Sequence, residues 1–137
     1  MGAWSVDAYG NDDAADWAYE LEEAEDLTPV EEAIQAVLSV GEEYLEAPEA
    51  TVALAAIEVL ARLAGNWGER NSYTETIDKW VEQTTAVPTP EILDNARSAI
   101  DRILGENSEL RELWEDSGDY EAWVQSVQSL RSRVGAA

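Results

Sequence analysis

A chain of 137 residues can bury one hydrophobic core, and its lack of cysteine and histidine excludes disulfides, thiolate or imidazole metal sites and the Ser-His-Asp arrangement. The formal charge is -22, and the residues up to Leu63 carry 16 acidic side chains against one basic side chain, Arg62. Such a field repels nucleic-acid phosphates and anionic lipids and attracts basic proteins, so we expect no nucleic-acid or membrane binding and consider a basic protein as partner.

The first ten residues contain turn formers and two aromatic side chains, and we expect an irregular N-terminal arm (residues 1–10) packed on the rest of the chain. Asn11 is the expected N-cap of a first helix, because apolar residues then recur at three- and four-residue spacing. Asp12 and Asp13 fall in the first turn of this helix, where the helix dipole favours negative charge. The apolar positions are Ala14, Trp17, Ala18, Leu21 and Ala24.

A second helix is expected to begin at Thr28. Thr28 and Glu31 have the spacing of a capping box, and Pro29 occupies the position where proline is favoured at a helix start. Gly41 is expected to end this helix, since glycine commonly terminates helices.

A third helix is expected to open at Pro48. Residues 48–64 are apolar around most of the helix circumference, and the polar stripe consists only of Thr51, Glu58 and Arg62. A helix that is apolar nearly all round is surrounded by other helices. We therefore predict that residues 48–64 form the centre of the fold.

The remaining sequence predicts four shorter helices. Ser72 begins a second capping box, a proline break at residues 88–90 precedes a helix that stops at Gly105, Ser108 caps a short helix, and a last helix follows Gly118. Strict two-residue alternation of the strand kind is nearly absent. The predicted fold class is all-α, a compact bundle of about six to seven helices around the central apolar helix.

We expect residues 1–137 to form one helical domain, because no linker is long enough to divide the chain. The start lacks the basic segment of a secretory signal, and the apolar run at residues 50–57 is much shorter than the roughly 20 residues that span a bilayer. These features predict a cytoplasmic protein. They do not indicate an oligomeric state.

Acidic side chains crowd the start of the first helix. Asp7, Asn11, Asp12, Asp13 and Asp16 offer the oxygen ligands that calcium, magnesium or manganese prefer, and Asp12 and Asp16, four residues apart, share a helix face. Their spacing is not that of an EF-hand loop, and acids early in a helix also complement its dipole. A hard-cation site and simple helix capping both remain open interpretations.

A second acidic cluster surrounds Tyr44. Glu42, Glu43, Glu46 and Glu49 suit either a solvated acidic face or, if one carboxyl is desolvated, the paired carboxylates of general acid/base hydrolysis. Nothing in the sequence indicates desolvation of either pair.

The tryptophans divide into two groups. Trp17 lies on an apolar helical stripe and is expected in the core, as are Trp80, Trp114 and Trp123. Trp4 and Trp67 lie in predicted loops instead. An indole in a loop either fills a gap over the helices or is left for a partner.

Six segments together resemble a known family: residues 2–4 (Gly-Ala-Trp), Tyr9, residues 11–17 (Asn-Asp-Asp-Ala-Ala-Asp-Trp), residues 20–21 (Glu-Leu), residues 44–50 and residues 108–114. They are similar to an uncharacterised bacterial family described as domain of unknown function 4259. The resemblance would cover essentially the whole chain. It implies a small bacterial cytoplasmic protein and brings no activity or cofactor with it.

The resemblance directs attention to the N-terminal motif as one unit. Ser5 and Asp7 depart from it, since the family's arm tends to have glycine at both positions. The candidate binding residues are Trp4, Tyr9, Asn11, Asp12, Asp16 and Trp17, joined by Tyr44 and Trp67.

The charge distribution, the missing catalytic side chains and the small size lead to a functional expectation. We expect a non-enzymatic, acidic interaction domain that binds a basic protein, as an immunity or inhibitor partner of a toxin would, without a cofactor. The alternative is a carboxylate-based cation-binding protein or hydrolase that uses Asn11, Asp12 and Asp16. The acidity also has a compositional explanation, because arginine outnumbers lysine seven to one.

Overall fold

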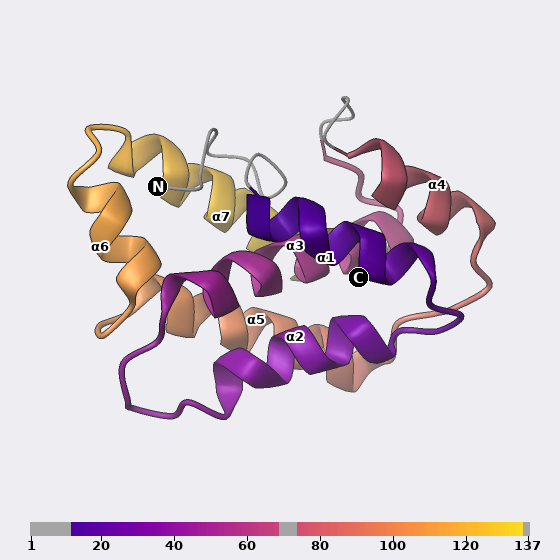
Figure 1. Cartoon of the computed structure of the whole chain (residues 1–137), viewed down its shortest axis with the longest axis horizontal. Helices are drawn as coiled ribbons and strands as arrows, with labels where there is room; N and C mark the ends of the chain where they lie inside the picture. Colours follow the sequence, from indigo (N-terminus) through magenta and orange to yellow (C-terminus); the bar gives the residue numbers. More distant parts are fainter. Residues whose placement is uncertain (1–11, 69–73, 136–137) are drawn as a thin grey trace.

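The computed structural model describes residues 12–68 and 74–135, and these residues fold into seven helices around one core (Figure 1). The arm predicted at residues 1–10 lies outside the described residues. No helix in the described part is long and apolar enough to cross a membrane. The helices are α1 (Asp12–Glu22), α2 (Thr28–Leu38), α3 (Ala47–Leu63), α4 (Glu75–Gln83), α5 (Pro90–Leu104), α6 (Glu109–Glu115) and α7 (Tyr120–Gly135).

Helix α3 lies at the centre of the bundle and contacts each of the other six described helices. Its residues from Ala50 to Arg62 are buried, except that Val52 is half-buried. Many of them are alanine, and small side chains let neighbouring helices approach from several sides. The central helix predicted at residues 48–64 is therefore confirmed, and the all-α fold class is confirmed with it.

The other helices pack on α3 and on one another, each burying an apolar stripe (Figure 1). Helices α2 and α5 pack together, α7 covers α5, and α1 lies against α4. The indole Nε1 of Trp80 donates to the Ala24 carbonyl at 3.0 Å, which ties α4 to the end of α1. The Trp114 and Trp123 rings stack at 6.2 Å between centroids and join α6 to α7.

Two helix starts differ from the capping that the sequence predicts. Leu27 occupies the N-cap of α2, and Thr28 already lies inside the helix. The Thr28 N–H instead donates to Asp26 Oδ1 at 2.9 Å, the local bond that an aspartate two residues earlier can make, and this bond holds the pKa of Asp26 below its usual value. Ser108 does stand at the N-cap of α6, but its hydroxyl makes no cap bond. The capping box predicted at Ser72 begins outside the described residues.

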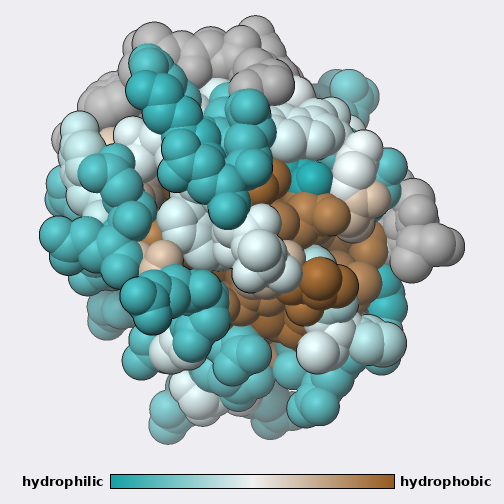
Figure 2. All heavy atoms as spheres, turned by 90° about the vertical axis from the view of Figure 1, so that its right-hand side faces the viewer, coloured by the Kyte–Doolittle hydropathy of each residue, from teal (hydrophilic) through white to brown (hydrophobic). Residues whose placement is uncertain are grey.

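One face of the bundle is partly apolar. Figure 2 shows apolar side chains gathered in the middle of the face that is turned to the right in Figure 1, with hydrophilic side chains around them. Helix α4 and the loop from α4 to α5 lie on this side. Val87 in that loop is 78% exposed.

Candidate functional site: an acidic loop junction

The loop between α2 and α3 meets the loop between α5 and α6. The Leu45 N–H donates to the Asn107 carbonyl at 2.8 Å, and the Glu109 N–H donates to the Leu45 carbonyl at 2.9 Å. These bonds form an isolated parallel bridge between Leu45 and Ser108. Two stretches of chain more than 60 residues apart in sequence are thereby held in register.

Arg102, near the end of α5, fastens the two loops together. Its guanidinium donates to Gly41 O and to Glu106 O, each at 2.8 Å, and also bonds the carbonyls of Glu43 and Asn107. Planar guanidinium donors suit this task because they reach several acceptors at once. The backbone of both loops is therefore fixed by one side chain.

Asn107 adds a further tie between the loops. Its φ of +56° is in the left-handed region, which asparagine tolerates better than most residues. Its Nδ2 donates to the Glu42 carbonyl at 3.2 Å. Gly41, at a φ of +63°, turns the chain after α2 and so starts the loop that Asn107 and Arg102 hold.

Tyr44 stands on the surface of this junction, 48% exposed. Its hydroxyl donates to Glu112 Oε1 at 2.9 Å. This bond, followed by desolvation and the charges of Glu112, Glu109 and Glu46, raises the pKa of Tyr44 to about 12. Glu109 Oε1 accepts from the Ala47 N–H at 2.7 Å, so a side chain of α6 caps the N-terminus of α3.

The result is a concentration of negative charge around one aromatic side chain. We call this surface the acidic junction; it holds seven glutamates and two arginines, five more negative than positive charges. Six of the glutamates are exposed and Glu109 is half-buried. The acidic junction consists of Tyr44, Glu42, Glu43, Glu46, Glu106, Glu109, Glu112, Glu115, Arg102 and Arg111.

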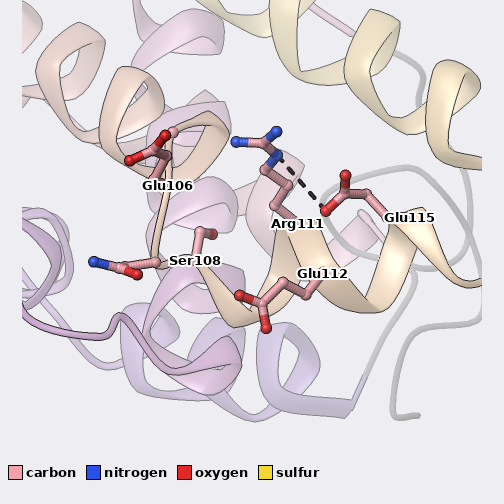
Figure 3. Close-up of a pocket in the computed structure, with 7 residues that line it drawn as sticks. Glu106, Ser108, Arg111, Glu112 and Glu115 are labelled. Atoms are coloured by element: carbon pink, nitrogen blue, oxygen red, sulfur yellow. Dashed lines mark ion pairs between the residues drawn. The ribbon is translucent and has the colours of Figure 1, made fainter.

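A shallow pocket of about 330 Å³ opens at the α6 side of the acidic junction (Figure 3). Arg111 lies in it, with Nη1 3.4 Å from the Leu104 carbonyl and Nε in an ion pair with Glu115 at 3.8 Å. Ser108 is 1% exposed, and its hydroxyl has no hydrogen-bond partner within the described residues. The pocket is lined by Gly105, Glu106, Asn107, Ser108, Arg111, Glu112 and Glu115.

A second polar cluster is buried between α3, α4 and α7. Arg62, 2% exposed, pairs with Glu58 on its own helix and with Asp78 of α4 at 2.8 Å. Arg133 of α7 reaches the same Glu58, with Nη1 3.0 Å from Oε2. Thr74 donates to Asp78 Oδ2 at 2.7 Å. Two carboxylates and two guanidiniums balance one another, which is how buried charges are tolerated.

Trp67 belongs to this buried cluster. Its ring lies against the Arg62 guanidinium, whose Cζ is 5.5 Å from the ring centroid, within the range of a cation–π contact. The side chain is half-buried and packs against the core. Trp67 therefore lies on the Arg62 guanidinium and against the core.

The N-terminal candidate unit is described only in part. Trp4, Tyr9 and Asn11 lie outside the described residues, and so does the side chain of Asp12, whose backbone begins α1. Asp16 is exposed on α1, whereas Trp17 is 5% exposed and lies in the core. The side chains that the structure describes contain no group of three or more acidic residues placed to hold a metal ion.

Sequence reasoning singled out Tyr44 but missed its neighbours from α6. Glu109 and Glu112 approach Tyr44 only through the contact between the two loops, which has no local sequence signal. Sequence reasoning also interpreted Glu58 and Arg62 as part of a polar stripe, whereas the structure shows them as a buried ion pair. Their four-residue spacing on an otherwise apolar helix was the available signal for a buried pair.

The described residues thus define an all-helical bundle with a charge-balanced buried cluster and an acidic surface junction. The chain belongs to the family described as domain of unknown function (DUF4259), whose model matches residues 2–126, and this confirms the resemblance seen in its motifs. No curated protein and no solved structure matches the chain.

Proposed function

We propose that the protein is a non-enzymatic interaction domain that binds a basic surface of another protein, in the manner of an inhibitor or immunity partner. The observation that best supports this proposal is the acidic junction, where the α2–α3 loop meets the α5–α6 loop and α6 and gathers seven glutamates on one surface. Three of them, Glu46, Glu109 and Glu112, act on the exposed Tyr44. The net charge of the whole chain is also negative, so the long-range electrostatic field of the protein and the local surface both favour a basic partner.

The arrangement of the acidic junction suits recognition. Like charges repel, and the bonds that Arg102 and Asn107 make to the loop backbones, together with the Leu45 bridge, oppose this repulsion between the loops. Those bonds use backbone carbonyl oxygens and not the side chains of the loops. Among the described residues, no ion pair is made by the exposed carboxylates of Glu42, Glu43 and Glu46. A fixed acidic face loses little conformational freedom when it binds. Tyrosine is also a residue type enriched at interfaces.

Affinity capture tests the proposal. The full chain is immobilised and exposed to extract of its source organism at about 50 mM and about 500 mM salt, retained proteins are identified by mass spectrometry, and the purified pair is measured by calorimetry. Two matched variants each remove three exposed negative charges. The junction variant carries Glu42→Gln, Glu43→Gln and Glu46→Gln, and the control variant carries Glu22→Gln, Glu23→Gln and Glu25→Gln.

We expect one identified basic protein that is retained at low salt and released at high salt, because screening weakens charge pairing between exposed groups. The junction variant should weaken its binding at least tenfold, and the control variant should have a smaller effect. The proposal fails if no basic protein is retained, if retention is insensitive to salt, or if the two variants bind equally.

A further inference from the structure

The pocket beside α6 has an uneven lining. Three of its side chains, those of Glu106, Glu112 and Glu115, carry negative charge, and one, that of Arg111, carries positive charge. Glu112 gives Oε1 to the Tyr44 hydroxyl, and Glu115 pairs with Arg111. The carboxylate of Glu106 has no hydrogen bond or ion pair among the described contacts. Arg111 Nε, in the same lining, is a buried donor whose nearest carboxylate is that of Glu115 at 3.8 Å, too far for a hydrogen bond. The lining nevertheless carries two more negative than positive charges.

Ser108 provides an independent sign that the pocket receives a ligand. A buried hydroxyl without a partner costs stability, so native proteins seldom retain one unless something else satisfies it. Ser108 stands at the N-cap of α6, where its hydroxyl would ordinarily bond the helix backbone, yet it makes no such bond. In Figure 3 its oxygen points toward the Arg111 side of the pocket.

The chemistry of these groups favours an organic cation. An ammonium or guanidinium group donates several N–H bonds and carries the charge that Glu106 and Glu112 require. The described acidic side chains form no group suited to a metal ion. A volume of about 330 Å³ lies at the small end of the range for ligand sites and accommodates the end of one long side chain.

We infer that this pocket receives the charged end of a lysine or arginine side chain of the partner, with Ser108 Oγ accepting one N–H and Glu106 and Glu112 supplying the counter-charge. The inference rests on the proposed function, since it names where the basic partner is anchored. Arg111 opposes the cation, because it is a like charge in the same pocket.

The test is a titration of the isotope-labelled full chain, followed by NMR at low ionic strength. The probes are the tripeptide acetyl-Gly-Lys-Gly-amide, its arginine counterpart, and spermidine. Ser108→Ala and Glu106→Gln should each raise the Kd for the tripeptides by about two- to fivefold, and Arg111→Gln should lower it by a similar factor. Glu31→Gln, an exposed acid on α2, is the control and should change the Kd much less.

Two results together support the inference: amide shifts concentrated at residues 105–115, and a Kd that rises in Ser108→Ala and Glu106→Gln but falls in Arg111→Gln. Shifts spread evenly over the acidic surface overturn it, as does a Kd unaffected by Ser108→Ala or raised by Arg111→Gln. If Ser108→Ala changes the Kd for spermidine but not for the tripeptides, a lysine or arginine side chain of the partner is not the cation that the pocket receives. The free Ser108→Ala protein should also have a higher Tm, whereas a structural hydroxyl predicts a lower one.

The two proposals fail in different ways. The titration uses no partner protein, so a basic protein captured without tripeptide binding in the pocket overturns this inference alone. Tripeptide binding without any captured basic protein overturns the proposed function and, with it, the partner as the source of the cation.

Discussion

Tyr44 is held in its neutral form by its surroundings. Its hydroxyl donates to Glu112, and a phenolate would lose that bond and face several carboxylates, so the pKa of Tyr44 rises from 10 to about 12. A pKa that is higher in the folded state means that the contribution of this group to stability is complete below about pH 10 and is lost as the pH rises through about 12. The Tyr44–Glu112 contact should therefore resist mild alkali.

Replacing the carboxylate should return Tyr44 to ordinary behaviour. In Glu112→Gln we expect the pKa of Tyr44 to fall toward 10, because the hydrogen bond to a charged acceptor is the largest cause of the shift. The measurement is ultraviolet difference titration, in which subtraction of the Tyr44→Phe curve isolates Tyr44. Glu106→Gln is the control, since Glu106 is absent from the causes of the shift. A Tyr44 midpoint near 10 in the unaltered protein would contradict the prediction.

At the scale of helices, the ion pairs of Arg62 hold α3 to α4, while Glu58 links the same helix to α7. Arg62→Met would leave Asp78 buried without this cation, and we expect a loss of about 3–5 kcal/mol in the free energy of unfolding, measured with urea. The double variant Arg62→Met with Asp78→Leu removes both members of the pair and should be less destabilised than Arg62→Met alone.

The double variant also guards against a trivial result. If Arg62→Met fails to fold and the double variant folds, the buried Asp78 carboxylate that has lost Arg62 is the cause. Asp78→Leu alone completes the set. If the loss in the double variant equals the sum of the losses in Arg62→Met and Asp78→Leu, the pair contributes no coupling and the prediction is wrong. Glu31→Gln serves as a reference for the loss of one exposed charge.

Helices and their order were predictable from sequence because the pattern that defines them is local. The apolar circumference of residues 48–64 was enough to place α3 at the centre, and Gly105 marked the end of α5 correctly. Contacts between distant segments left no such pattern. Glu112 lies 68 residues from Tyr44, so the acidic junction appears only when two loops are packed together. The prediction that Thr28 caps α2 was wrong for a different reason: Asp26, two residues earlier, accepts the Thr28 N–H, and Thr28 lies inside the helix.

For the whole molecule, the formal charge of -22 predicts a response to salt. Self-repulsion destabilises a compact, highly charged chain, and it is screened when the Debye length falls from about 30 Å at 0.01 M to about 8 Å at 0.15 M. We expect sodium chloride to raise the Tm over this range by about 4 °C for each kcal/mol of repulsion removed, measured by calorimetry. A flat or falling Tm would mean that ion pairs outweigh the repulsion.

Calcium chloride at equal ionic strength separates screening from specific binding. Screening alone predicts little difference between the two salts once ionic strength is matched, because the Debye length is set by ionic strength. We expect this outcome, since no group of acids among the described side chains is placed to hold a metal ion. A hard-cation site instead predicts an extra rise in Tm that follows the calcium concentration. That extra rise should vanish in Asp12→Asn with Asp16→Asn and persist in Glu42→Gln with Glu43→Gln. Only this combination would favour a cation site at the start of α1 over an acidic surface that acts through its field.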